Sequence, residues 1–288
     1  MKWYYAMMEK DSPTLVSIII PVYNAEKYIL ETIKSVLSQD YKPIEIIVID
    51  DGSTDNTAKI IKSLNTEIRY VFQENQGVSA ARNHGFKLSE GQYLCFLDAD
   101  DWYYPQNIKE KVNYFLHNPS CGLIHSWVEI TDRNLNIKKT VMGKEGENIT
   151  QEVLNFIPTA IPSPSNVMLK RSVINEIGGF DLNLSTSADF DMWLRITHKF
   201  KVGMLNKPLV KYRLHEDGMF TNLALQLKDM NYILKKYKNS AYSIYNWNVL
   251  QDRFYNSLLK ASLKKFQIRI FLKLLLQFLQ YKFLAIRV

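Results

Sequence analysis

The stretch Gln92-Tyr93-Leu94-Cys95-Phe96-Leu97-Asp98-Ala99-Asp100-Asp101 decides the fold of this chain. A short apolar run of this kind is typical of a buried strand, and here acids follow it directly. The arrangement also occurs earlier, where Leu15–Ile20 leads into Pro21-Val22-Tyr23-Asn24 and Ile44–Ile49 leads into Asp50-Asp51-Gly52-Ser53. Parallel strands of an open α/β sheet end at one edge, and ligands bind in the crevice there. The polar residues are therefore expected to line one crevice.

Helical periodicity separates the expected strands. Helices are predicted from Glu26 to Leu37, from about Asp55 to Leu64 and from Val78 to Leu88, with a strand at Ile68–Phe72. This alternation favours a doubly wound α/β fold with a mostly parallel sheet flanked by helices. Less regular elements are expected after it: strands at Cys121–Ile130, Asn166–Lys170, Val202–Leu205 and Leu209–Tyr212, helices at Arg171–Ile177 and Asp189–Lys199, and a polar hairpin or loop over Asn134–Thr150.

Asp98-Ala99-Asp100 places two carboxylates around one residue at the mouth of a strand. Such a pair can hold a divalent cation while substrate phosphates supply further oxygen ligands. The alternative is that Asp100 or Asp101 caps the helix expected near Tyr104–Leu116. The strand directly before the acids favours the cation site.

Asp50-Asp51-Gly52-Ser53-Thr54-Asp55 forms a strand-to-helix turn. Capping by Ser53 or Asp55, with Gly52 relieving the tight turn, accounts for the later residues. It leaves Asp50 and Asp51 unexplained, because adjacent acids repel each other unless a ligand or a base takes one up. A carboxylate here can accept a hydrogen bond from uracil or ribose, so nucleotide binding is predicted.

Four ordered stretches together resemble the GT-A glycosyltransferases of family 2. They are Val16–Tyr28, Ile49–Asp55, Asn75–Asn83 and Phe96–Asp101. The resemblance covers roughly residues 15–216 and implies a Rossmann-like GT-A catalytic domain at 15–220. Within it, we expect a nucleotide-binding half at 15–117 and an acceptor half at 118–220. An N-terminal extension at 1–14 and a basic helical C-terminal region at 221–288 would flank this domain.

The resemblance implies a site for a UDP-sugar donor. Pro21, Tyr23 and Asp51 are expected to hold the uracil, with Glu26 near the ribose or the phosphates. Asp50 is expected to bind the nucleotide beside Asp51.

The same resemblance implies contacts to the ribose, the diphosphate and a metal. Asn75 and Arg82 are expected to contact the nucleotide, with Arg82 pairing with Asp51 or a phosphate. Asp98 is expected to touch the ribose, and Asp100 to bind Mn²⁺ or Mg²⁺ bridging the diphosphate. His215 closes a stretch similar to the family's Tyr-Arg-x-His and is expected to complete the metal shell.

The resemblance also implies transfer with inversion at the sugar, which requires a carboxylate that takes the proton of the acceptor hydroxyl. Asp189 resembles the family's acidic motif and is expected to be this base, with Asp191 as the second candidate. The family usually has Glu-Asp here, and Ala188 replaces the Glu, which puts acceptor recognition in doubt. The alternative is that Asp189 only caps the following helix.

The positive charge lies in the C-terminal region. Residues 221–288 hold 12 Lys and Arg against two acids, a balance of +10 within a net charge of +7, so residues 1–220 carry −3. A basic region with leucine and aromatic residues is suited to an anionic membrane surface, here over residues 231–288, or it packs on the catalytic domain. Neither a secretory signal nor a spanning helix is expected.

Together with these features, the resemblance implies a metal-dependent inverting glycosyltransferase that acts on a glycan or lipid-linked acceptor in cell-surface polysaccharide or glycolipid synthesis. It is expected to be cytoplasmic and peripheral at the inner face of the membrane, with Cys95 and Cys121 reduced. The alternatives are a non-catalytic sugar-nucleotide-binding scaffold, for which Ala188 is the hint, and a nucleotidyltransferase. No nucleic-acid partner is expected, because no recognised nucleic-acid-binding module occurs.

Overall fold

The computed structural model describes residues 13–64, 66–155, 159–216, 218, 222–237, 239–264, 271–272 and 274–279. Most of the expected N-terminal extension, and Lys265, Arg269, Lys273, Lys282 and Arg287 of the basic region, lie outside these residues.

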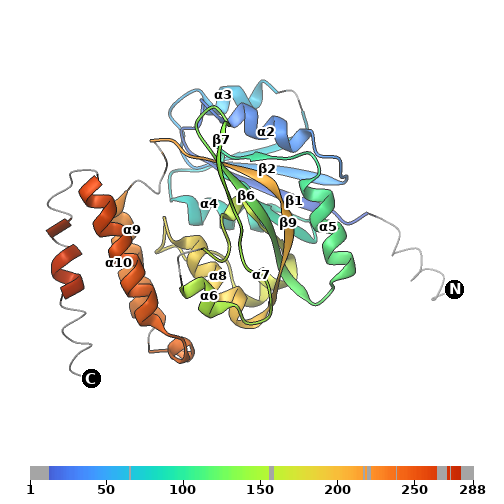
Figure 1. The fold of residues 1–288 in the computed structure, drawn as a ribbon. Coiled ribbons are helices and arrows are strands. Elements are labelled where there is room, and N and C mark those ends of the chain that lie inside the picture. Colours follow the sequence, from blue (N-terminus) through green and yellow to red (C-terminus); the bar gives the residue numbers. More distant parts are fainter. Residues whose placement is uncertain are drawn as a thin grey trace.

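One sheet organises the described part of the chain, with strand order β3-β2-β1-β4-β8-β6-β9-β5 and β7 beside β6 (Figure 1). Most of its paired residues lie in parallel ladders, which join β3-β2-β1-β4 and β6-β9. The short strand β8 is antiparallel to both β4 and β6 and connects the two parallel parts. The strands are β1 Val16–Val22, β2 Ile44–Asp50, β3 Ile68–Phe72, β4 Tyr93–Phe96, β5 Trp102–Tyr103, β6 Cys121–Thr131, β7 Ile137–Val141, β8 Met168–Lys170 and β9 Lys201–Arg213.

Helices cover both faces of the sheet because successive strand residues point to opposite sides. Ile18 and Ile20 pack with α2 and α5, whereas Ile19 packs with the cluster that contains α7 and α8. Helix α4 lies close on β1, where a Cβ at Gly85 would come within 2.3 Å of the Ile19 side chain. The helices are α2 Ile29–Leu37, α3 Thr57–Lys62, α4 Val78–Leu88, α5 Asn107–His117, α6 Thr150–Leu154, α7 Arg171–Ile177 and α8 Ala188–Lys199, with a 3-10 turn at Pro164–Asn166.

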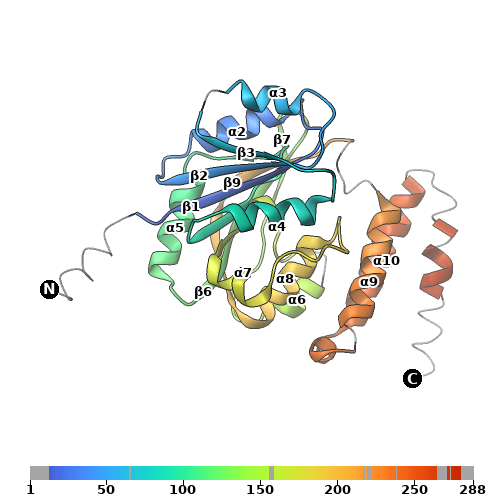
Figure 2. The same ribbon diagram turned by 180° about the vertical axis from the view of Figure 1, so that it is seen from behind.

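The C-terminal region is built onto the same core. Helices α9 Leu223–Tyr237 and α10 Trp247–Lys264, with the 3-10 turn Ala241–Ile244 between them, lie side by side beyond α8 (Figure 2). Leu227, Ile233 and Leu250 are buried in the hydrophobic cluster that also holds Trp193 of α8. Of the two alternatives for the basic region, the described residues thus show packing: the inner face of its helices packs against the cluster that contains α8. No helix among the described residues is both long and apolar enough to cross a membrane.

The expected α/β fold is confirmed, and its departures from expectation are local. β3, α4 and α7 have the predicted bounds, and the Asn134–Thr150 segment contains β7, which pairs antiparallel with β6. The two short strands expected at 202–205 and 209–212 are one strand, β9, whose pairing with β6 shifts register near Trp127. The irregular pairing at this place explains why the sequence pattern is interrupted.

Candidate active site

Asp51 directly follows β2, and the protein itself satisfies its carboxylate. Oδ1 accepts hydrogen bonds from Gln73 Nε2 at 2.7 Å and from the backbone N–H of Gln76 at 2.9 Å. Oδ2 accepts one from the backbone N–H of Gly77 at 2.8 Å, at the N-terminal end of α4, where the helix dipole favours a negative charge. Asp51 therefore needs no ligand to relieve repulsion from Asp50, and it fixes the loop before α4.

Asp50 lies beneath this edge, and the expected nucleotide contact does not fit its position. Its side chain is fully buried. Oδ1 accepts the backbone N–H of Ser53 at 2.8 Å, and Oδ2 accepts the Tyr70 hydroxyl at 2.7 Å. These bonds close the turn in which Gly52 has a φ of +85°, so the structure gives Asp50 a structural role.

The other residues expected at the base and ribose lie around the ends of β1 and β3. Tyr23 is 54% exposed and Asn75 is also exposed, whereas Pro21 is buried inside β1. Glu26 is half-buried, and its Oε2 accepts two hydrogen bonds from Asn56, at 2.9 Å from the backbone and 2.8 Å from the side chain. Tyr23 and Asn75 are thus open to a ligand, while Glu26 holds the β1 and β2 loops together.

Asp98 follows β4 and pairs with Arg82 from α4. The distance from Arg82 Nη2 to Asp98 Oδ1 is 2.7 Å, and the two side chains are 6% and 26% exposed. Arg82 was expected to pair with Asp51 or a phosphate, and the structure gives it Asp98 instead. Burial raises the pKa of Asp98; the Arg82 charge opposes this rise and the charge of Asp100 adds to it.

Asp100 and His215 meet at the predicted metal position. His215 Nε2 is 2.7 Å from Asp100 Oδ2, and these side chains are 9% and 29% exposed. The other ring nitrogen, Nδ1, is buried without a hydrogen-bond partner. Arg213 supports the pair, because its Nε donates to the Asp100 carbonyl oxygen at 2.8 Å. The alternative that Asp100 or Asp101 caps a helix is wrong, because α5 begins only at Asn107.

A metal at this position would need ligands from a substrate in addition to those from the protein. Among the described residues, no group of three or more His, Cys, Asp or Glu side chains is placed to hold an ion. Asp100 and His215 offer one carboxylate and one imidazole, and Mn²⁺ accepts both kinds of donor. Metals that act on phosphates are commonly held by one or two protein groups together with phosphate oxygens and water. The donor set thus fits such a cation.

Asp189 lies in the first turn of α8, close enough to the Arg82–Asp98 pair to feel both charges. Burial raises its pKa; the positive charge of Arg82 lowers it, and the negative charge of Asp98 raises it again. Its Oδ1 accepts the backbone N–H of Phe190 at 2.9 Å, while the N-cap position of α8 belongs to Ser187. The alternative that Asp189 is the helix cap therefore does not fit.

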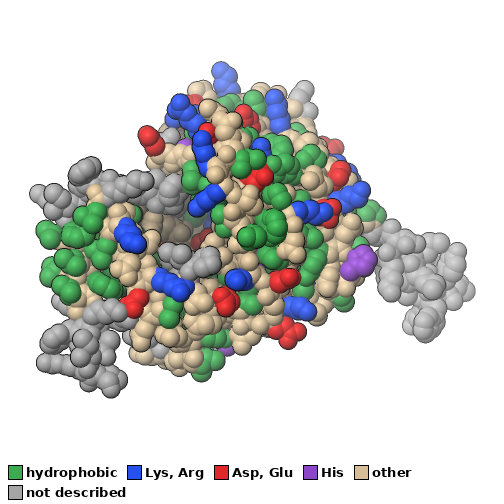
Figure 3. Space-filling view, in the orientation of Figure 1, with side chains coloured by type: hydrophobic (Ala, Val, Ile, Leu, Met, Phe, Trp, Pro, Cys, Tyr) green, Lys and Arg blue, Asp and Glu red, His purple; other side chains and the backbone are tan. Residues whose placement is uncertain are grey.

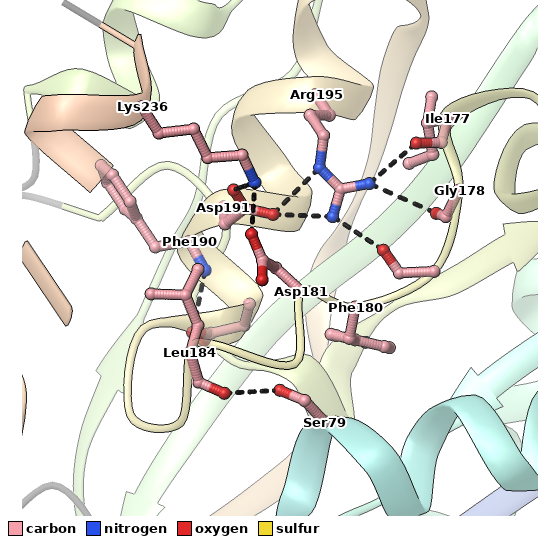
Figure 4. A network of polar contacts seen from close by, with 12 residues as sticks. Ser79, Ile177, Gly178, Phe180, Asp181, Leu184, Phe190, Asp191, Arg195 and Lys236 are labelled. Carbon is pink, nitrogen blue, oxygen red and sulfur yellow. Dashed lines mark hydrogen bonds and ion pairs between the residues drawn. The ribbon is translucent and has the colours of Figure 1, made fainter. Parts of the chain in front are cut away.

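Asp191, the second candidate for the base, is not part of this cluster. It is fully buried and holds Arg195, Lys236 and Tyr237 at 2.6–2.9 Å. Figure 4 shows Arg195 and Lys236 at Asp191, and the contact to Lys236 joins α8 to α9. With both oxygens taken by strong donors, Asp191 is a structural residue, because a base must reach the acceptor hydroxyl.

Tyr212 of β9 is a further residue of the site, and its position in the sequence predicted no role for it. Burial raises the pKa of its hydroxyl well above the usual range, and the charges of Asp101, Asp98, Asp100 and Asp189 raise it further. The charges of these four carboxylates, from the end of β4 and the start of α8, thus act on one tyrosine of β9. Alternation along β9 could have suggested that Tyr212 and Arg213 face opposite ways, but not that Tyr212 faces the acids.

Three comparisons connect this chain to known proteins. A profile of the family described as Glycosyl transferase family 2 matches residues 17–178. An uncharacterized glycosyltransferase of Rickettsia conorii is 34% identical over 219 residues, which are 72% of this chain but 36% of that protein. An uncharacterized glycosyltransferase of Methanocaldococcus jannaschii is 30% identical over 253 residues, which are 84% of this chain and 86% of that protein.

The fold is also similar to that of a solved structure. S. aureus TarS 1–349 in complex with UDP-GlcNAc superposes with a TM-score of 0.65 at 18% identity, covering 92% of this chain and 80% of that one. At this identity, the similarity concerns the fold.

Proposed function

Because this chain belongs to glycosyl transferase family 2, we propose that it transfers one sugar from a UDP-sugar to an acceptor hydroxyl with inversion. The observation that carries the proposal is the pair of contacts Arg82–Asp98 and Asp100–His215 just after β4, with Asp189 near enough to feel the charges of Arg82 and Asp98. The UDP-GlcNAc named for the S. aureus TarS structure supports UDP as the nucleotide.

The donor would lie along the ends of β1, β2 and β4. Tyr23 and Asn75 are exposed there and can contact the base, while Asp51 fixes the loop around Asn75 through Gln76 and Gly77. Asp98, which pairs with Arg82, would contact the ribose. Asp100 and His215 would hold Mn²⁺ or Mg²⁺, which acts as a Lewis acid that stabilises charge on the leaving diphosphate.

Asp189 would take the proton from the acceptor hydroxyl. A raised pKa makes a carboxylate a better proton acceptor, provided that it is deprotonated at the working pH. Arg82 limits this rise, so the charges balance the strength of the base against its ionisation. In this assignment Asp191 takes no part in the chemistry.

A donor panel tests the proposed activity. Release of UDP or another nucleoside diphosphate is measured for several NDP-sugars with Mn²⁺, with Mg²⁺ and with EDTA. We expect release from at least one UDP-sugar in the presence of metal, with loss in EDTA. UDP binding without release from any UDP-sugar would instead favour the non-catalytic scaffold.

We place the acceptor at a membrane surface, as a glycan or lipid-linked sugar in cell-surface polymer or glycolipid synthesis, with the protein peripheral on the cytoplasmic face. The outer leucine face, defined as Leu263, Leu272, Leu276 and Leu279, is 52–63% exposed, and Lys260 near it is also exposed. Figure 3 shows hydrophobic and basic side chains together on the outside of the C-terminal helices. Apolar side chains beside positive charge suit an anionic lipid surface.

Vesicle flotation tests this surface. The protein should float with phosphatidylglycerol vesicles and not with phosphatidylcholine vesicles, and Leu272→Ser with Leu276→Ser should reduce the floating fraction severalfold. Deleting the region is unsuitable, because Ile233 and Leu250 belong to the core. Equal flotation of the variant and the parent protein would contradict the assignment.

A further inference from the structure

The segment from Phe180 to Ser187 carries the chain into α8 and ends two residues before Asp189. On one side it is fixed to α4. The Asn83 side chain exchanges two hydrogen bonds of 2.8 Å with the backbone N–H and carbonyl oxygen of Phe180. Ser79 Oγ donates to the Leu184 carbonyl oxygen at 2.7 Å. Helix α4 also carries Arg82, so the same helix contacts both Asp98 and this segment.

On the other side, Asp229 of α9 holds the segment. Its Oδ2 accepts hydrogen bonds from the backbone N–H groups of Ser185 and Ser187, both at 3.0 Å. The same oxygen accepts the hydroxyls of Thr186 at 3.0 Å and Ser185 at 3.2 Å. Asp229 is 1% exposed. A buried carboxylate that receives several donors makes strong, charge-assisted bonds, and leaving these donors unpaired would be costly.

Lys236, two turns further along α9, makes the second connection. Its Nζ lies 2.7 Å from Asp181 and 2.7 Å from Asp191. Tyr232 of the same helix donates to Asp181 at 3.0 Å. Figure 4 shows Lys236 reaching from α9 between the two carboxylates, with Arg195 on the far side of Asp191. One face of α9 thus binds both the start of the segment and the first turn of α8.

From these contacts we infer that α9 positions the catalytic base, with Asp229 and Lys236 as the positioning residues. Asp189 takes its hydrogen bond from the neighbouring backbone N–H of Phe190, so the placement of its carboxylate follows the backbone of the turn. That backbone is held by Asp229 at Ser185 and Ser187. The inference rests on the proposed role of Asp189. It gives the C-terminal region a part in the reaction, beyond packing or attachment to a surface.

Two matched pairs of variants test the inference in the full-length protein. Asp229→Asn is compared with Lys228→Ala, and Lys236→Ala with Lys235→Ala, since Lys228 and Lys235 are exposed neighbours on the same helix. Hydrogen exchange followed by mass spectrometry reports on the segment directly. We expect amide exchange in residues 181–190 to accelerate at least tenfold in Asp229→Asn and Lys236→Ala, with residues 44–51 unchanged. Exchange at the parent rate in 181–190 would overturn the inference.

Catalysis supplies the second readout, with UDP release from UDP-GlcNAc, water being the acceptor. Asp229→Asn should lower kcat at least tenfold and leave the Kd for UDP within twofold. Loosening the turn exposes Asp189 to water, which removes part of the burial that raises its pKa, so the acidic limb of the kcat profile should move to lower pH. A purely structural role would lower the amount of folded enzyme without moving this limb, and an unmoved limb counts against positioning.

The reference variant Asp189→Asn separates the two claims. If it loses turnover while Asp229→Asn keeps the parent rate and pH profile, the positioning role fails and the proposed function stands. If Asp189→Asn keeps turnover, the proposed base is wrong. Should UDP-GlcNAc give no release with the parent protein, the exchange experiment still decides whether α9 holds the segment.

Discussion

Replacing Asp191 by Asn tests whether this acid is structural, as its contacts indicate. The substitution keeps the size of the side chain and removes its charge, so it leaves no cavity. Asp191 receives two hydrogen bonds from Arg195, at 2.9 and 2.7 Å, one from Lys236 at 2.7 Å and one from Tyr237 at 2.6 Å. We expect the variant to be less stable, with Asp98, Asp100 and Asp189 left in place.

The size of the expected loss in stability depends on the contacts that Arg195 and Lys236 keep in the variant. Breaking a buried ion pair typically costs about 3–5 kcal/mol in the free energy of unfolding. Arg195 keeps its hydrogen bonds to the backbone carbonyl oxygens of Ile177, Gly178 and Gly179. Lys236 keeps its ion pair with Asp181. We therefore expect about 3 kcal/mol, near the lower end of this range. For a chain of this size, that corresponds to a fall in Tm of about 6–12 °C.

The assay is thermal unfolding monitored by circular dichroism, and UDP release is measured well below Tm. Asp132→Asn is the matched control, because Asp132 also receives several hydrogen bonds, from Asn134 and Asn136, but lies on an exposed turn. The control should melt with the parent protein. An Asp191→Asn protein that melts with the parent and has lost UDP release would refute the structural role and make Asp191 the base.

Two further predictions concern charge and metal. Arg82→Met removes the positive charge that lowers the pKa of both Asp98 and Asp189, so both pKa values rise. Since the base acts deprotonated, the acidic limb of UDP release should move to higher pH; an unchanged or lower position argues against the assignment. His215→Ala should raise the Mn²⁺ concentration for half-maximal release by about tenfold or more, whereas His117→Ala, on the exposed end of α5, should not. Equal Mn²⁺ dependence in both variants would exclude His215 as a ligand.

The strands and their acidic ends were predictable because local pattern decides them. β1, β2 and β4 are short apolar runs buried on both faces, and parallel pairing then places the residues after them at one edge. The bounds of α4 and α7 follow in the same way from helical periodicity.

The partners of the acids were not predictable, because they come from distant parts of the chain. Arg82 could have met Asp51 or Asp98, and the packing of α4 on the sheet selects Asp98. The sequence offers Asp191 as the second candidate for the base after Asp189. Two residues along a helix place their side chains on roughly opposite sides, however, so Asp191 meets Lys236, 45 residues further along. Charge composition likewise could not reveal that Asp229 of the basic region is buried, because burial depends on tertiary packing.

Turnover and UDP affinity of Asp189→Asn decide whether Asp189 is the catalytic base. The carboxylate lies beside the Arg82–Asp98 pair without forming the proposed metal pair of Asp100 and His215. If Asp189 is the base, the Kd for UDP should stay within twofold of the parent value while kcat falls by about 100-fold or more, the usual contribution of a general base. Turnover within a few-fold of the parent enzyme, at equal UDP affinity, would contradict this role.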